Sequence, residues 1–266
     1  MALGRAAFVK LEHAFEVRDR LRDLLAELQE IERPLRREDN AQSHSRMVQT
    51  QWVLEAVPDY TKAALLMGDF IHNLRAAMDY TVWAVTPQQI RESSPTRVMF
   101  PLHSKREKWT DWSKDRKTWY GPTVFEVLES FQPFHAGDDQ LHPLHILQFL
   151  SNTDKHQLLN IVATGQVDMG TVKVVPEPTG GVNSWVNTGV VEAGSVLARV
   201  EFIRPDEPAS VTLHPVFAYE QVFRYVDQNK AEHWLAIGDA MNAVGPQVVD
   251  AIGYVLSAHI KDCRSE

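Results

Sequence analysis

The stretch Gly68-Asp69-Phe70-Ile71-His72-Asn73-Leu74-Arg75-Ala76-Ala77-Met78-Asp79-Tyr80 places titratable side chains at helical intervals inside an apolar run. At about 100° per residue, Asp69, His72, Arg75 and Asp79 fall within roughly a 120° arc of one helix. The other side carries apolar or small side chains: Leu66, Phe70, Leu74, Ala77, Met78 and Thr81. The stretch therefore predicts an amphipathic helix whose four titratable residues form a polar seam.

Members of the polar seam stand at distances along the chain at which helical side chains touch. Asp69 and His72 are three residues apart, and Arg75 and Asp79 are four apart. Such a set can bind a metal, hold a phosphate, or form hydrogen bonds and ion pairs only among its own members. The sequence leaves these three interpretations open. Gly68 costs a helix about 1 kcal/mol relative to Ala. It either allows another segment to approach closely or is a tolerated kink.

Composition and charge limit the classes of function. The chain has 266 residues, is 44% hydrophobic and 23% charged, and is long enough for one large domain or two small ones. A formal net charge of −8 argues against general binding of nucleic acid through a basic surface, but it allows a local basic patch. The single cysteine, Cys263, excludes an internal disulfide and a Cys-rich zinc site.

No targeting or membrane segment is apparent. Lys10, Glu12 and Glu16 interrupt any apolar core of a signal peptide. No apolar run approaches the roughly 18 to 20 residues that a membrane helix needs. The sequence therefore predicts a cytoplasmic protein without a membrane partner, and it leaves a homo-oligomer open.

Hydrophobic periodicity predicts an α+β fold. Helices are expected over 5–33, 58–85, 105–120, 122–131, 141–159 and 229–261, with a strand at 47–54, a loop at 36–45 and an extended piece at 98–102. Period-two patterns at 171–175, 182–191, 197–203 and 210–217 predict an antiparallel β-meander. No long linker divides the chain. We expect a single domain over 1–266, with a helical bundle at about 1–160, the meander at about 161–218 and a C-terminal helix packed with them.

Two further segments carry polar chemistry. Ser151-Asn152-Thr153-Asp154-Lys155-His156 ends a predicted helix, where Lys and His complement the helix dipole. A capping role and a functional role are both open for this cluster. Residues 105–120 interleave basic side chains with Trp109, Trp112 and Trp119, which suits a stacking and phosphate-binding surface. The same tryptophans fit one buried helical stripe.

Several motifs taken together resemble a family. They are Gly-Asp-x-x-His-Asn-Leu-Arg-x-x-x-Asp at 68–79, Phe100-Pro101, Gln132-Pro133-Phe134, Pro143-Leu144 and Ser-Asn-x-Asp-Lys-His at 151–156. The region 45–165 resembles a group of uncharacterised bacterial proteins, especially from actinobacteria and their phages. That family implies no established activity.

The helical part is also distantly similar to HEPN proteins, which are helical nucleases and nucleotide-binding modules. Their usual mark is Arg, four to six residues, then His. In the polar seam Arg75 follows His72, and no His lies downstream at that spacing. Arg37 and His44 fit by count but lie in a predicted loop.

Three functions remain open. The first is a helical binding or interaction module whose polar seam, with Asp154 and His156, forms a buried network, because buried charges must be paired. The second is a hydrolase acting on phosphoesters or nucleic acid with a divalent metal ion. Its ligands would be Asp69, His72, Asp154 and His156.

In that hydrolase Asp79 is the expected base or ligand support, and Arg75 neutralises charge on a phosphoryl group. The remaining polar residues of the two clusters, Asn73, Asn152 and Lys155, are expected to contact the ligand. The third function is metal-independent binding of RNA or a nucleotide by residues 105–120 with Arg75. The chain lacks a glycine-rich phosphate loop, a Gly-x-Ser-x-Gly elbow and a His-Glu-x-x-His motif.

Overall fold

The computed structural model describes residues 4–40, 45–137, 141–207, 210–227 and 229–265. Helices and antiparallel sheets occur together in this part of the chain, which confirms the α+β class. The chain forms two compact units, a helical unit of residues 1–24, 61–160 and 223–266 and a strand unit of residues 25–60 and 161–222. The expectation of a single domain stays a prediction.

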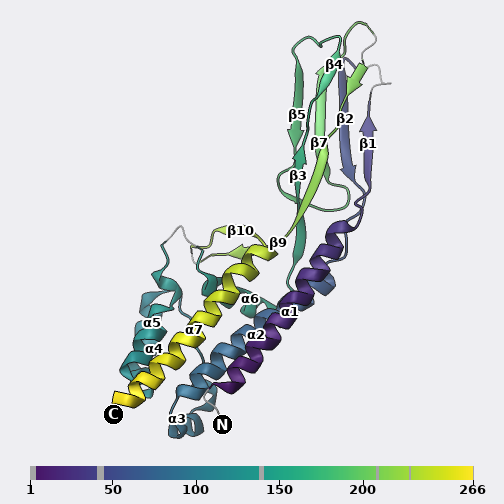
Figure 1. Cartoon of the computed structure of the whole chain (residues 1–266). Helices are drawn as coiled ribbons and strands as arrows, with labels where there is room; N and C mark the ends of the chain where they lie inside the picture. Colours follow the sequence, from purple (N-terminus) through teal and green to yellow (C-terminus); the bar gives the residue numbers. More distant parts are fainter. Residues whose placement is uncertain (1–3, 41–44, 138–140, 208–209, 228, 266) are drawn as a thin grey trace. The chain divides into compact units, whose positions relative to one another are not determined.

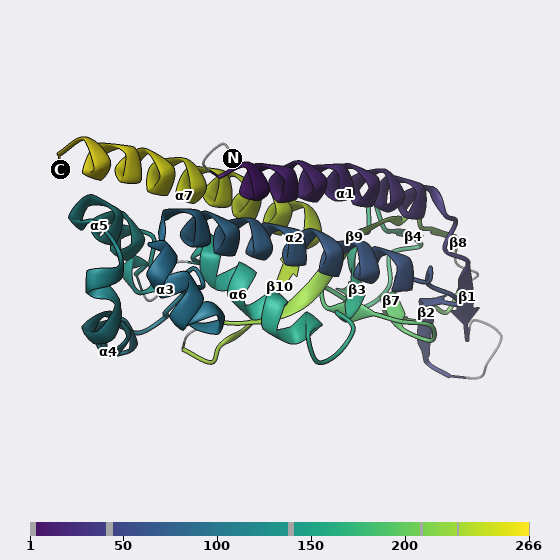
Figure 2. The same cartoon turned by 90° about the horizontal axis from the view of Figure 1, so that it is seen from below.

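The helical unit is built around its C-terminal helix. Its helices are α1 (Arg5–Glu30, of which residues 5–24 belong here), α2 (Thr61–Val85), α3 (Gln88–Ser93), α4 (Arg106–Arg116), α5 (Pro122–Ser130), α6 (Pro143–Asp154) and α7 (Ile237–Ser265). Helices α2, α5 and α6 pack against α7, and α2 also packs against α6 (Figures 1 and 2). No helix in the described residues is both long enough and apolar enough to cross a membrane.

The apolar side of α2 supplies much of this core. Phe70, Leu74 and Met78 are fully buried, as the helical period predicts. Gly68 is buried where α2 meets α6, and a Cβ atom there would overlap the Asp154 carboxylate. This confirms that the glycine permits close approach of another segment.

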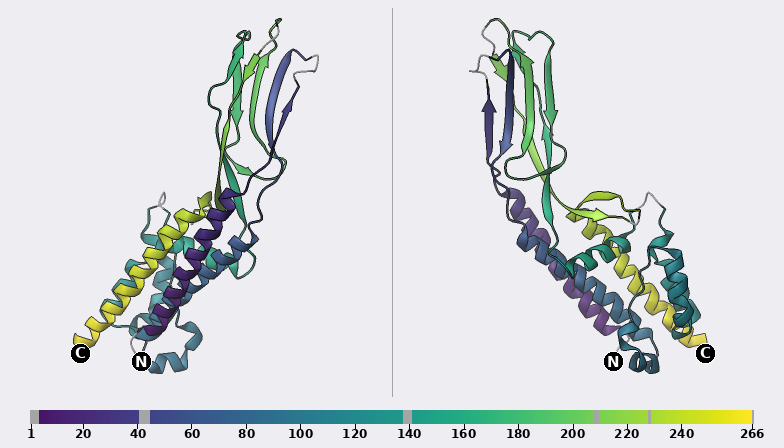
Figure 3. Two further views of the ribbon diagram at one scale, coloured as in Figure 1. Left: turned by 45° about the vertical axis from the view of Figure 1, so that its right-hand side comes forward. Right: turned by 180° about the vertical axis from the view of Figure 1, so that it is seen from behind.

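The strand unit contains three antiparallel groups of strands. One four-stranded sheet has the order β1-β2-β7-β5, with β1 (Leu35–Asp39), β2 (Met47–Leu54), β7 (Val196–Ile203) and β5 (Val182–Val186) (Figure 3). Within the unit β3 (Ile161–Asp168) lies between β9 (Val216–Val226) and β6 (Val190–Val191), and β4 (Lys173–Val175) pairs with β8 (Ser210–Thr212). Trp52, Val200 and Phe202 lie in its core. The strands are antiparallel as expected, but the predicted meander is wrong, because β7 pairs with β2 and β5, and β4 pairs with β8, rather than each strand with the next one in sequence.

The predicted loop over 36–45 is wrong for its first residues. Residues 35–39 form β1, which pairs with β2 in the register Arg37 to Trp52. Its two arginines form ion pairs with the two acidic residues that follow them, Arg36 with Glu38 and Arg37 with Asp39. Charged side chains are common in edge strands. Because they leave no alternation of apolar and polar residues, the sequence pattern does not indicate a strand here. His44 lies outside the described residues.

The start predicted for the C-terminal helix is also wrong. Residues 232–236 form β10 (Glu232–Ala236), which pairs with the end of β9. The Asp227 carboxylate accepts hydrogen bonds from the backbone N–H groups of Asn229 and Ala231 and contacts His233 at 2.9 Å. This turn closes a hairpin, and α7 therefore begins only at Ile237.

Candidate functional site

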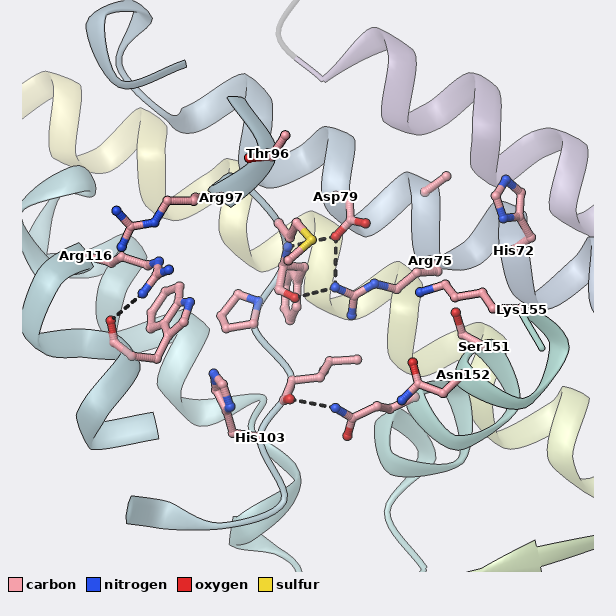
Figure 4. A pocket seen from close by; sticks show the side chains of 17 residues that line it. His72, Arg75, Asp79, Thr96, Arg97, His103, Arg116, Ser151, Asn152 and Lys155 are labelled. Atoms are coloured by element: carbon pink, nitrogen blue, oxygen red, sulfur yellow. Dashed lines mark hydrogen bonds and ion pairs between the residues drawn. The ribbon is translucent and has the colours of Figure 1, made fainter. Parts of the chain in front are cut away.

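A pocket of about 460 Å³ lies inside the helical unit. Its wall combines residues of α2, the segment between α3 and α4, α4 itself and α6 (Figure 4). The side chains that matter for its chemistry are His72, Arg75, Asp79, Arg97, His103, Trp112, Arg116, Gln148, Ser151, Asn152 and Lys155. The polar seam and the cluster at 151–156 therefore contribute to one cavity.

Arg75 and Asp79 form the α2 side of the pocket. Their side chains are 18% and 29% exposed and form an ion pair with 3.1 Å between Nη2 and Oδ1. Arg75 Nη2 also donates to the Phe100 carbonyl at 2.7 Å, and the Phe100 N–H donates to Asp79 Oδ1 at 2.8 Å (Figure 4). The Arg75–Asp79 pair thus forms hydrogen bonds with both the N–H and the carbonyl group of Phe100.

Burial makes the ionised form of the Asp79 carboxyl group less favourable. Burial raises the pKa of Asp79, and Arg75, the Phe100 N–H and Lys155 oppose that rise. Lys155, just beyond the end of α6, is exposed and extends toward Arg75 in Figure 4. Two cations therefore surround the one carboxylate found among the described residues that line the pocket.

Arg97 and Arg116 form the α4 side. Arg116 is half-buried, its guanidinium carbon lies 5.4 Å from the Trp112 ring centre, and its Nη1 donates to the Trp112 carbonyl at 3.3 Å. Its buried Nε has no hydrogen-bond partner within the described part of the chain. Arg97 is exposed and forms an ion pair of 3.5 Å with Asp115. The α4 side thus has a half-buried guanidinium that forms no ion pair with a carboxylate in the described part of the chain.

His103 sits between these two sides. Burial lowers the pKa of its imidazole, and Arg116, Arg75 and Lys108 lower it further. The ring is therefore neutral near pH 7. Its buried Nε2 has no hydrogen-bond partner among the residues that the structure describes.

Two glutamines fix the backbone that carries His103. Gln132 is fully buried, donates to the Pro101 carbonyl at 2.9 Å and accepts from the His103 N–H at 2.9 Å. Gln148 donates to the Leu102 carbonyl at 2.8 Å. Together with Arg75 and Asp79, these side chains bond most of the polar groups along residues 100–103.

The three residues expected to contact a ligand have different positions. Asn152 and Lys155 line the pocket. Asn73 does not: it is buried, accepts from Lys10 Nζ at 3.0 Å and donates to the Asp69 carbonyl at 2.7 Å. Its amide group is hydrogen-bonded to Lys10 of α1 and to the backbone of α2. The structure therefore gives no support to a role of Asn73 in binding a ligand in this pocket.

The four expected metal ligands are not gathered at one point. No three His, Cys, Asp or Glu side chains in the described residues are arranged to hold a metal ion. Asp154 lies close enough to Asp69 and His72 to feel their charges: burial and Asp69 raise its pKa, and His72 lowers it. His156 instead lines a second pocket. The predicted metal site over Asp69, His72, Asp154 and His156 therefore finds no support in the described residues, and His156 lies apart from the other three.

The sequence left two interpretations of the tryptophans in residues 105–120, a buried helical stripe and a surface for stacking. Trp109 and Trp119 are buried, at 3% and 8% exposure. Trp112 is half-buried and lines the pocket. The core stripe thus accounts for two rings, and the third lines the pocket while stacking on Trp109 and Tyr120.

The sequence search missed Arg97 and His103. Five residues separate them, so they fit the spacing of Arg, four to six residues, then His, and both line the pocket. Arg97 ends a 3-10 turn and His103 follows an extended stretch, outside any long helix. A search for that spacing over the whole chain would have found them.

Comparisons of the chain with protein-family models, with curated proteins and with solved structures find no match. The resemblances to the actinobacterial family and to HEPN proteins stay predictions.

Proposed function

We propose that this protein is a metal-independent binding module for a nucleotide or RNA, and that a phosphate group of the ligand lies in the pocket described above. The observation that carries the proposal is the charge of this pocket. Among the described residues, four cationic side chains and one carboxylate, that of Asp79, line it, although the whole chain has a net charge of −8. The cations are Arg75, Arg97, Arg116 and Lys155.

Three features of the pocket support a phosphate-bearing ligand. Guanidinium groups bind phosphate oxygens through charge-assisted hydrogen bonds. Arg116 and His103, whose buried nitrogens have no partner in the described residues, both line this pocket. Trp112 provides an aromatic face in the same wall. The cytoplasmic location expected from the sequence stays part of this proposal.

The test is calorimetric titration of the protein with nucleoside monophosphates in the presence of EDTA. Arg116→Met keeps the packing against Trp112 and removes the charge, and we expect it to weaken binding about tenfold or more, the scale of one hydrogen bond to a charged group. Arg106→Met, in the same helix but outside the pocket, is the matched control. No binding by the parent protein, or equal losses in both variants, would contradict the proposal.

A second candidate function is metal-independent cleavage of RNA in the same pocket. The observation that favours it is the position of Arg97 and His103, which share the HEPN spacing and line one cavity. A neutral imidazole can accept a proton as a general base. Cleavage of an RNA oligonucleotide in EDTA, lost in His103→Gln but kept in His135→Gln, would establish it, and intact RNA would remove it.

A further inference from the structure

A second pocket, of about 500 Å³, adjoins the first inside the helical unit. Both pockets are lined by Gln148 and Asn152, which stand one helical turn apart on α6. The second pocket is also lined by His145, Phe149, Thr153, His156 and Gln157. The two pockets therefore meet at these two amides.

The two pockets differ in charge. The second is lined, among described residues, by no Asp, Glu, Lys or Arg side chain. Burial lowers the pKa of His145, so that ring is neutral near pH 7. A ligand that fills both pockets must therefore have one anionic end and one uncharged end.

The second pocket offers what a flat heterocycle needs. Phe149 is half-buried, and its ring is held edge-on to Tyr225 with 5.2 Å between centres. His145 Nδ1 is hydrogen-bonded to the Tyr225 hydroxyl, which fixes the imidazole. Asn152 and Gln157 carry amides that both donate and accept, the combination that pairs with the edge of a nucleobase.

We propose that the ligand is a nucleoside monophosphate that lies across Gln148 and Asn152, with its phosphate in the cationic pocket and its base in the neutral pocket beside Phe149. This inference rests on the proposed function and adds the orientation of the ligand. It assigns the affinity for phosphate to the first pocket and the preference for a base to the second.

The experiment compares inorganic phosphate, ribose 5-phosphate and the four nucleoside 5′-monophosphates on the full chain in EDTA. Stacking of a base on an aromatic ring contributes about 1 to 3 kcal/mol, so at least one nucleotide should bind about tenfold tighter than ribose 5-phosphate. Because both ligands carry the same phosphate monoester, their affinity ratio isolates the base.

Phe149→Leu should bring this ratio close to one and leave the affinity for ribose 5-phosphate unchanged. Phe131→Leu is the matched control, because Phe131 is also half-buried, contacts Tyr254 and lines neither pocket. Should Phe149→Leu unfold, Gln157→Ala at an exposed position of the second pocket replaces it, with a smaller fall in the same ratio.

The outcomes separate this inference from the proposed function. Equal affinities for ribose 5-phosphate and every nucleotide would overturn the inference and leave phosphate binding intact. So would a ratio that neither Phe149→Leu nor Gln157→Ala reduces. If none of the ligands binds, the proposed function fails as well.

Discussion

Two arginines on opposite sides of one pocket have different surroundings. On the α2 side Arg75 is bonded to the Asp79 carboxylate and the Phe100 carbonyl. On the α4 side Arg116 reaches only a backbone carbonyl and two tryptophan rings, and its Nε has no partner in the described residues. A charge satisfied within the chain supports the fold, whereas a buried charge that is left unsatisfied is available to a ligand. We therefore expect the two sides to differ in what their mutation changes.

The largest expected effect lies in the structural contacts of the pocket. Gln132→Leu leaves the His103 N–H and the Pro101 carbonyl without their partner inside the protein. Each unsatisfied buried group costs about 1 to 3 kcal/mol, so the free energy of unfolding should fall by about 3 kcal/mol. Urea unfolding measures this loss. Gln89→Leu, at an exposed position on α3, is the control and should change stability little.

A smaller loss is expected at Asp79. Asp79→Ala removes the partner of Arg75 and the acceptor of the Phe100 N–H. Breaking a fully buried pair costs about 3 to 5 kcal/mol, but both side chains here are partly exposed, so we expect about 2 kcal/mol. Asp79→Asn keeps an acceptor for the Phe100 N–H but leaves Arg75 without a negative partner, so it should cost less than Asp79→Ala, about 1 kcal/mol.

The same unfolding experiment decides whether Asp79 belongs to the fold or to a reaction. Equal stability of Asp79→Ala and the parent protein would mean that the ion pair contributes nothing to folding. The two sides of the pocket would then not differ as we propose, and the predicted catalytic role of Asp79 would gain weight.

The parts of the fold that the sequence revealed are those set by local periodicity. The buried side of α2 follows from the spacing of Phe70, Leu74 and Met78, and the close approach at Gly68 follows from a glycine within a helix. The edge strand β1 was missed because four consecutive charged residues, Arg36 to Asp39, give it no apolar face. The strand β10 was missed because its pairing depends on β9 and on the turn at Asp227.

The candidate site was predictable only in part, for a related reason. Arg75, Asp79, Asn152 and Lys155 were found because each belongs to a dense polar cluster in the sequence. Arg97, His103 and Gln148 do not belong to either of these polar clusters in the sequence. Only the packing of α2, α4 and α6 brings them to one cavity. Asn73 shows the opposite error, since Lys10, 63 residues away, takes up its amide.

The smallest effect concerns the pH dependence of stability on the α4 side. Burial and the charges of Arg116, Arg75 and Lys108 hold the pKa of His103 below its usual value of 6.5. Below pH 6.5 the unfolded chain therefore binds a proton that the folded protein does not, and stability falls as the pH falls. In His103→Gln this contribution is absent, so the urea midpoint of the parent should decline more than that of the variant between pH 7 and the lowered pKa.

Phosphate should reverse this shift if the α4 side is the ligand-binding side. A bound phosphate places negative charge near the imidazole, and an opposite charge favours the protonated ring. We expect saturating phosphate to raise the pKa of His103, followed through the Cε1 proton by NMR and assigned with His103→Gln. At a phosphate concentration that half-saturates the parent protein, Arg116→Met should show a smaller rise above its own phosphate-free pKa, because phosphate then binds more weakly. An unchanged pKa of His103 in saturated protein would place the phosphate elsewhere, and the unpartnered nitrogens of Arg116 and His103 would then have no role in binding it.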